Sequence, residues 1–158
     1  MTLSYYAHGA GPVHVLCAHS WVASSVSFAP MLTHLDSEAA TWVFPDFAGY
    51  GASKSGDIKE SIPGMAEDLV SLADDLGWDS FHLVGHSMGG QAVQAVLGNT
   101  TNQKRVTTAS LVSPVPSQGF PLDSESEDLF LNAASNSAIM EGDVDTLTGG
   151  QRSKGVSQ

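Results

Sequence analysis

The sequence contains a single cysteine, Cys17, in 158 residues, so it can form no internal disulfide and no cysteine-rich zinc site. Basic residues are also few: six Lys and Arg face seventeen Asp and Glu, and the formal net charge is −11. A surface of that sign repels nucleic-acid phosphates and anionic lipid headgroups. We therefore expect neither nucleic acid nor a membrane surface among the partners of this protein.

Long apolar runs are absent as well. No stretch reaches the ~20 residues that cross a bilayer, and residues 1–11 lack the basic start and apolar run of a signal peptide. A protein with a lone thiol and no export signal is expected in the reducing cytoplasm. The chain has 42% hydrophobic and 15% charged residues, which is typical of a soluble globular protein, and its length favours one domain.

Short apolar runs alternate with segments of helical periodicity over most of the chain. The runs predict buried strands, and the turn signal at residues 9–12 predicts that the first two strands pair as a hairpin. Strands joined through helices pair in parallel, so the prediction is an α/β fold whose mostly parallel sheet has helices on both faces. The expected strands are 3–7, 13–18, 41–44, 81–84 and 107–112, and the expected helices are 26–35, 61–76 and 88–97.

The helix expected over residues 61–76 has the clearest signals. Ser61 is suited to cap its start, Pro63 fits its first turn, and Gly77 is suited to end it. Between them an apolar stripe recurs at helical spacing, formed by Met65, Leu69, Leu72 and Leu76.

Gly85-His86-Ser87-Met88-Gly89 fits the pattern G-x-S-x-G between an expected strand and an expected helix. A sharp strand-to-helix turn lifts the serine hydroxyl above the carboxyl edge of the sheet, and small flanking residues permit the strained bend. The helix start brings the Met88 amide and a positive dipole end to where an oxyanion would form. Ser87 is therefore predicted to be a nucleophile. The alternative interpretation is that the glycines merely make a close turn.

Two further segments follow strands in the same way: His19-Ser20-Trp21 after residues 13–18, and residues 45–53 after 41–44. With the G-x-S-x-G turn, this order of motifs resembles the serine-type α/β-hydrolase family, esterase- and lipase-like enzymes, over about residues 5 to 120. The resemblance implies that Trp21 and Met88 donate their backbone amides to the oxyanion. Ser20 replaces the family's usual glycine, and a positive φ there would cost about 1 kcal/mol.

The resemblance also implies a structural role for residues 46–53 and a branch of the family for a serine at position 87. Residues 46–53 match the family's Asp-x-x-Gly-x-Gly-x-Ser turn, in which two glycines allow a tight bend beside the active-site rim, with Ala48 where arginine is common. A serine at position 87, rather than an aspartate, argues against the dehalogenase and epoxide-hydrolase branches.

In this family a carboxylate and then a histidine follow the serine along the chain. Carboxylates do follow Ser87, but no histidine does. Only His19 and His86 are expected at the carboxyl edge of the sheet, so they are the candidates for a surrogate base. The competing interpretations are that His19 bonds backbone in its loop and that His86 packs behind the turn. All six histidines precede the serine, namely His8, His14, His19, His34, His82 and His86.

Cys17 and the acidic run at residues 123–128 are expected to have structural rather than catalytic or metal-binding roles. Cys17 lies near a strand end and is expected to be a buried core residue rather than a thiol nucleophile. The acidic run at residues 123–128 lacks the spacing of metal ligands, so we expect no metal and no cofactor.

We expect a hydrolase core over residues 1–121, followed by the start of a cap-like segment and a polar tail over 122–158. A short acidic helix is expected over 122–131, residues 133–140 are expected to extend it or to start another, and a frayed tail is expected over 148–158. Because the family's sheet continues with further strands, the chain is expected to represent a truncated, N-terminal part of the fold.

Two functions remain open on these residues. The first is hydrolysis of small ester-like substrates by Ser87, weak because its triad is incomplete. The alternative is a truncated scaffold that self-associates without turnover. In either case the strand at 107–112 is expected to leave an unpaired edge, which predicts a homodimer.

Overall fold

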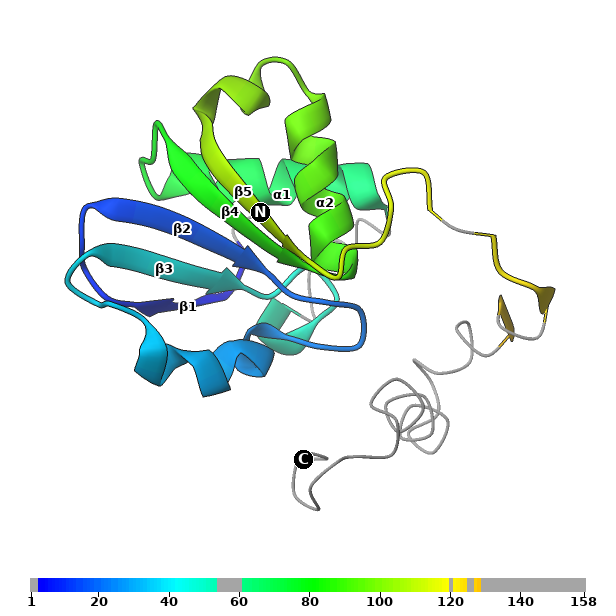
Figure 1. Ribbon diagram of the computed structural model, residues 1–158, viewed down its shortest axis with the longest axis horizontal. Helices are drawn as coiled ribbons and strands as arrows, with labels where there is room; N and C mark the ends of the chain where they lie inside the picture. The colour runs from blue at the N-terminus through cyan, green and yellow to red at the C-terminus, as the bar shows by residue number, and fades with distance from the viewer. Residues whose placement is uncertain (1–2, 54–60, 120, 125–126, 129–158) are drawn as a thin grey trace. The chain divides into compact units, whose positions relative to one another are not determined.

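The computed structural model describes residues 3–53, 61–119, 121–124 and 127–128. The chain divides into two compact units, Met1–Gly119 and Phe120–Gln158. The first unit is built on a five-stranded sheet (Figure 1) in the spatial order β1-β3-β2-β4-β5. Its strands are β1 (Tyr5–His8), β2 (Val13–Ala18), β3 (Ala40–Pro45), β4 (Phe81–His86) and β5 (Val106–Val112).

The sheet is mostly parallel, which confirms the predicted α/β class. Strands β2, β3, β4 and β5 run parallel to one another, and β1 pairs antiparallel with β3. From β2 the chain crosses to β3 on one side and then returns to β4 on the other, so the strand order reverses between β2 and β4. In the β2–β4 pairing Ala18 lies opposite Gly85, so the loops that follow these two strands emerge side by side. Such a reversal point is where α/β sheets bind ligands.

The predicted hairpin between the first two strands is wrong. β1 pairs with β3, and β3 separates it from β2. The glycine-rich turn passes over the chain that leads into β3: a Cβ on Gly11 would lie 2.2 Å from the carbonyl carbon of Ala39. The turn signal marked a close backbone crossing rather than a two-strand hairpin.

The helix α1 (Ile62–Asp75) follows its sequence signals closely. The Ser61 hydroxyl accepts the backbone N–H of Gly64 at 3.2 Å, a cap that typically contributes about 1 kcal/mol. Gly77 follows the helix at φ +71°, where a side chain would be strained. Among the described residues of the first unit, the other helices are α2 (Met88–Gly98) and the 3-10 helices η1 (Ser25–His34), η2 (Gly51–Ser53) and η3 (Asn102–Arg105).

The segment that was expected to be helical near residues 26–35 forms the 3-10 helix η1 instead of an α-helix. Pro30 lies inside it. Proline has no N–H, and its ring collides with the carbonyl four residues earlier in an α-helix, so the interior of an α-helix excludes it. At both ends of η1 the bonds span three residues, as in Ser27 N–H to the Ser24 carbonyl at 3.0 Å and Leu35 N–H to the Leu32 carbonyl at 3.3 Å.

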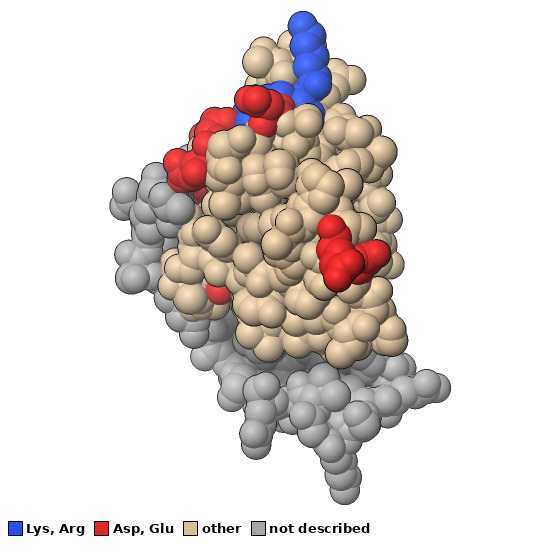
Figure 2. Space-filling view, turned by 90° about the vertical axis from the view of Figure 1, so that its left-hand side faces the viewer, with Lys and Arg blue, Asp and Glu red and all other residues tan. Residues whose placement is uncertain are grey.

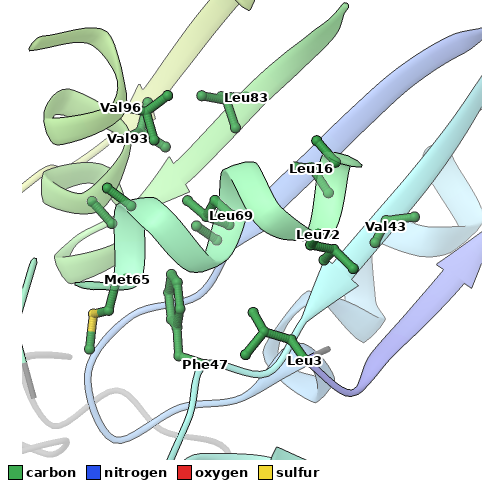
Figure 3. Packing of buried hydrophobic residues seen from close by; sticks show 14 of the residues in the cluster. Leu3, Leu16, Val43, Phe47, Met65, Leu69, Leu72, Leu83, Val93 and Val96 are labelled. Carbon is green, nitrogen blue, oxygen red and sulfur yellow. The ribbon is translucent and has the colours of Figure 1, made fainter. Parts of the chain in front are cut away.

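Two hydrophobic clusters lie on the two faces of the sheet. On one face α1 and α2 cover the strands, and Leu69 and Leu72 of α1 approach Leu16 and Val43 of the sheet (Figure 3). On the other face a smaller cluster of strand residues, with Cys17 and Phe44 at its centre, packs against side chains of η1. Burying each large apolar side chain stabilises the fold by about 1.5–3 kcal/mol. The predicted helical cover of both faces is therefore confirmed, with a 3-10 helix on the second.

In the second unit, the Glu127 amide donates to the Asp123 carbonyl at 2.9 Å, a helical contact within the expected helix 122–131. The rest of that segment, the expected helix 133–140 and the expected tail 148–158 lie outside the described residues.

Candidate active site

Ser87 connects the last residue of β4, His86, to the first residue of α2, Met88. Its backbone has φ 52° and ψ −113°, a conformation that costs a non-glycine residue about 1–3 kcal/mol. Hydrogen bonds hold it in place: the Ser87 N–H donates to the Val112 carbonyl at 3.0 Å, and its carbonyl accepts the amide of Val115 at 3.1 Å. The predicted strained strand-to-helix turn is confirmed, and Ser87 as a whole residue is partly exposed.

The glycines around Ser87 let this turn pack against the end of β2. A Cβ on Gly89 would lie 2.3 Å from the Ala18 carbonyl oxygen and 2.6 Å from that of His19. A Cβ on Gly85 would lie 2.6 Å from the Gly89 carbonyl oxygen. A side chain at Gly89 would push the helix start away from the β2 loop, and one at Gly85 would push it away from the end of β4. The glycines of the G-x-S-x-G motif therefore permit the bend at Ser87, and they also let the start of α2 with Met88 pack against the β2 loop with Trp21.

His19 is fully buried in the loop that follows β2, and both ring nitrogens bind backbone. Nε2 lies 3.1 Å from the Phe47 backbone nitrogen, and Nδ1 lies 2.8 Å from the Ser20 carbonyl oxygen. A backbone N–H can only donate, so Nε2 accepts; a neutral ring then carries its proton on Nδ1 and donates it to Ser20. Burial lowers the pKa of His19 and outweighs the opposing effects of the Ser20 carbonyl and the Asp46 carboxylate. The ring is thus held neutral in one tautomer.

The backbone strain in this loop lies at Val22. The sequence predicts strain at Ser20 if that position needs the positive φ of the family's glycine, and Ser20 does not have a positive φ. Val22 has φ 47°. A β-branched residue in this region is a rare outlier that surrounding structure must hold in place. The Ser20 hydroxyl donates to the Trp21 carbonyl at 3.1 Å, and the half-buried Trp21 packs against the main core. The loop is therefore built without the family's glycine.

Asp46 organises the loop that follows β3. Its carboxylate is buried and accepts the Ser25 amide at 2.6 Å and the Ala52 amide at 2.8 Å. Burial acts to raise the pKa of this carboxyl, but these hydrogen bonds and the nearby His19 lower it below its ordinary value. Gly49 and Gly51 have φ of 89° and 47°, which confirms the tight glycine turn. Asp46 is a structural anchor of the rim.

Tyr50, from the same turn, was not singled out by the sequence. Its hydroxyl lies 3.8 Å from the Met88 sulfur, and its ring centroid is 5.1 Å from that of His19. Burial raises the pKa of Tyr50. The residue thus touches both predicted oxyanion segments. The only feature of the sequence that could have indicated Tyr50 is its position between Gly49 and Gly51, in a turn expected at the carboxyl edge of the sheet.

His14, His82 and His86 lie where the sheet topology predicts. His14 and His82 are the second residues of β2 and β4, at the end of the sheet opposite Ser87. The His14 ring stacks on Trp78 at 4.4 Å, and His82 Nδ1 lies 2.7 Å from the Thr108 hydroxyl. His86, the last residue of β4, is partly buried and lies opposite Val112 of β5.

Cys17 is fully buried, and burial raises the pKa of its thiol to about 12. A thiol that stays protonated and enclosed is a poor nucleophile, so the predicted core role is confirmed. Within the ranges that the structure describes, no group of three or more His, Cys, Asp or Glu is arranged to hold a metal ion. None of the described helices is both long and apolar enough to span a bilayer.

The geometry defines an α/β-hydrolase core, and comparison with known proteins agrees. A family model described as alpha/beta hydrolase fold matches residues 13–138, so the chain belongs to that family.

Among curated proteins, the chain is 33% identical over 87 residues to a serine hydrolase-like protein of Danio rerio, covering 51% of this chain and 26% of that protein. It is 38% identical over 71 residues to N-formylmaleamate deformylase of Pseudomonas putida, covering 44% and 25%. Among solved structures, a marine microorganism esterase aligns with a TM-score of 0.70 at 19% identity, covering 85% of this chain and 51% of that one. The chain therefore spans about a quarter of these curated relatives and about half of that structure.

Proposed function

We propose that this chain carries the nucleophile and oxyanion site of a serine hydrolase that acts on small carboxylic-ester-like substrates. The observation that carries the proposal is the strained backbone of Ser87, at φ 52° between β4 and α2. Strain of this kind persists where structure over-determines it, and it is concentrated at active sites. Ser87 is partly exposed and lies at the point of the sheet where the strand order reverses.

In the proposed reaction the Ser87 oxygen bonds to the substrate carbonyl carbon while its proton passes to a base. The tetrahedral oxyanion is stabilised by the amides of Met88 and Trp21 and by the positive end of the α2 dipole. The first N–H groups of a helix have no partner within the helix, which suits the Met88 amide to this role. Collapse of the intermediate releases the alcohol with a proton, and water then releases the acid.

The mechanism needs a base that accepts the Ser87 proton. Of the two candidates at this edge, His19 already binds backbone through both ring nitrogens. His86 is therefore the surrogate base that we propose for this chain, and hydrolysis is expected to be slow. When a serine protease such as subtilisin loses its triad, the oxyanion donors and substrate binding alone retain a rate about 10³-fold or more above that in water.

Substrate class follows from the nucleophile and the relatives. Serine rather than aspartate at the turn supports acyl transfer over epoxide opening. Relatives named as a serine hydrolase-like protein and a deformylase support carbonyl chemistry on small molecules. The face in Figure 2 has acidic side chains in separate groups and basic ones only toward one end, so it offers a phosphate backbone no continuous basic surface. The expected cytoplasmic location stays a prediction.

The test is covalent labelling by a fluorophosphonate together with hydrolysis of p-nitrophenyl acetate. We expect one label, mapped to Ser87 by mass spectrometry, and its loss in Ser87→Ala. Cys17→Ala is the matched control and should label at the parent rate, because that thiol is enclosed and protonated. His86→Gln should slow labelling if His86 is the base. An unlabelled parent, or a label that survives Ser87→Ala, would overturn the proposal.

Self-association is a second candidate, favoured by β5. No described strand pairs with the outer side of β5, and its Leu111 and Val112 are 40% and 51% exposed. We propose a homodimer through this edge, because unpaired strand edges recruit a second chain. Sedimentation should show a dimer at micromolar concentration, shifted toward monomer by Leu111→Lys. A dimer that takes no fluorophosphonate label would favour a scaffold without turnover; a monomer at all concentrations would exclude this proposal.

A further inference from the structure

In the loop after β2, one peptide unit carries both the Ser20 carbonyl, which accepts a hydrogen bond, and the Trp21 N–H, which can donate one. The Ser20 carbonyl and the Trp21 N–H belong to the same planar trans peptide, so they point in opposite directions. His19 Nδ1 holds the Ser20 oxygen at 2.8 Å. Fixing that oxygen therefore also fixes the direction of the Trp21 N–H.

We propose that His19 is a positioning residue: its neutral ring, protonated on Nδ1, holds the Ser20 carbonyl so that the Trp21 amide is aimed at the oxyanion. The inference rests on the proposed function of Ser87 for its consequence in the reaction. His19 itself touches no substrate in this role, since both ring nitrogens bind backbone.

The opposite side of the ring determines which nitrogen carries the proton. The Phe47 N–H, in the loop that follows β3, donates to Nε2 at 3.1 Å, so that nitrogen carries no proton. The Phe47 ring meets the imidazole edge-on at 4.9 Å and the Tyr50 ring lies 5.1 Å away, so the imidazole is enclosed. The β3 loop thus specifies the tautomer, and the tautomer orients the β2 loop.

The aimed peptide lies close to the nucleophile turn. The position of a Cβ on Gly89 is 2.6 Å from the His19 carbonyl oxygen, so the backbone before Ser20 touches the first turn of α2. Val22, at φ 47°, turns the chain immediately after Trp21. With no glycine at position 20, the side chain of His19 and the strain at Val22 restrict this peptide from both ends.

Two substitutions separate the two hydrogen bonds of the ring. In His19→Asn the side-chain amide nitrogen takes the place of Nδ1 and can still donate to the Ser20 carbonyl, while the Phe47 amide loses its acceptor. In His19→Gln the amide oxygen takes the place of Nε2 and can still accept from Phe47, while the donor to Ser20 is lost. Each variant removes one hydrogen bond from the same buried site, so each controls for the stability cost of the other.

The experiment measures saturation kinetics of fluorophosphonate labelling at Ser87, with urea unfolding in parallel. We expect the maximal labelling rate of His19→Gln to fall roughly tenfold or more with unchanged half-saturation, as for loss of an oxyanion donor. His19→Asn should stay within about threefold of the parent. Equal rates in the two variants, or the reverse order, would overturn the inference.

Nuclear magnetic resonance tests the positioning role of His19 independently of fluorophosphonate labelling at Ser87. The ring nitrogen-15 signals of His19 should show a protonated Nδ1 and a bare Nε2, and the backbone amide signal of Trp21 should move in His19→Gln more than in His19→Asn. The opposite tautomer, or equal movement of the Trp21 signal, would refute the positioning role even with Ser87 active. If the parent is not labelled while these signals behave as expected, the hydrolase proposal fails and the orientation of the Trp21 peptide by His19 stands.

Discussion

The turn after β4 carries its strain at Ser87 between two glycines, whereas the turn after β2 carries its strain at Val22 with no glycine in residues 18–24. In the first, bare backbone at Gly89 allows tight contact with neighbouring carbonyls. In the second, the His19 ring bonds the backbone of Phe47 in the loop that follows β3. The first turn is shaped by small residues close in sequence. The second depends on a side chain that bonds the backbone of Phe47, in the loop that follows another strand.

The largest effect on stability is expected where the two turns touch. Gly89→Ala would place a Cβ 2.3 Å from the Ala18 carbonyl oxygen, against backbone that cannot easily move. We expect a loss of about 1–3 kcal/mol or more, typical of overpacking. Gly98→Ala is the control in the same helix, since nothing lies within 4 Å of its Cβ position. It should gain up to about 1 kcal/mol. Urea unfolding of both variants measures this, and equal losses would show that the contact is not what requires glycine.

The second prediction concerns acid, and it tests the side-chain bridge. Burial lowers the pKa of His19 below its ordinary 6.5, so just below pH 6.5 the unfolded chain binds a proton that the folded chain does not. The free energy of unfolding contributed by this site is therefore complete above pH 6.5 and declines as the pH falls below it. The lowered pKa of Asp46 acts only below its ordinary 3.8 and leaves this window untouched.

Urea unfolding between pH 8 and 5 provides the measurement. His19→Gln should flatten the decline below pH 6.5, because glutamine does not titrate. His34→Gln, which changes an exposed histidine on η1, should leave the decline at its parent slope. A slope that survives His19→Gln would assign the acid sensitivity to another group.

The smallest effect is expected from the strain at Val22. Alanine and glycine both remove its side chain, but only glycine accepts φ 47° without strain. Val22→Gly should therefore be more stable than Val22→Ala by about 1 kcal/mol. At Val26, which is 73% exposed on η1 and has no positive φ, the order should reverse by about 0.5–1 kcal/mol. Thermal or urea unfolding of the four variants checks the sign, and the same order at both sites would remove the evidence for strain.

Much of the fold could be predicted because its signals are local. Ser61, Pro63 and Gly77 mark α1, and apolar runs mark the strands. The pairing of β1 could not be predicted, because the same glycine-rich turn serves a hairpin or a crossing, and only the position of β3 decides. Pro30 was visible in the sequence, but the choice of a 3-10 helix around it depended on packing.

The candidate site divides in the same way. The sequence by itself determined the Ser87 turn, because the small residues that permit the bend lie within two positions of the serine and the helix start follows at once. Only the tertiary structure decided the role of His19, whose Nε2 partner lies 28 residues away, and of Asp46, whose Ser25 partner lies 21 residues away. A buried polar group takes its tautomer and charge from whichever partners the fold brings to it, and no local pattern names those partners.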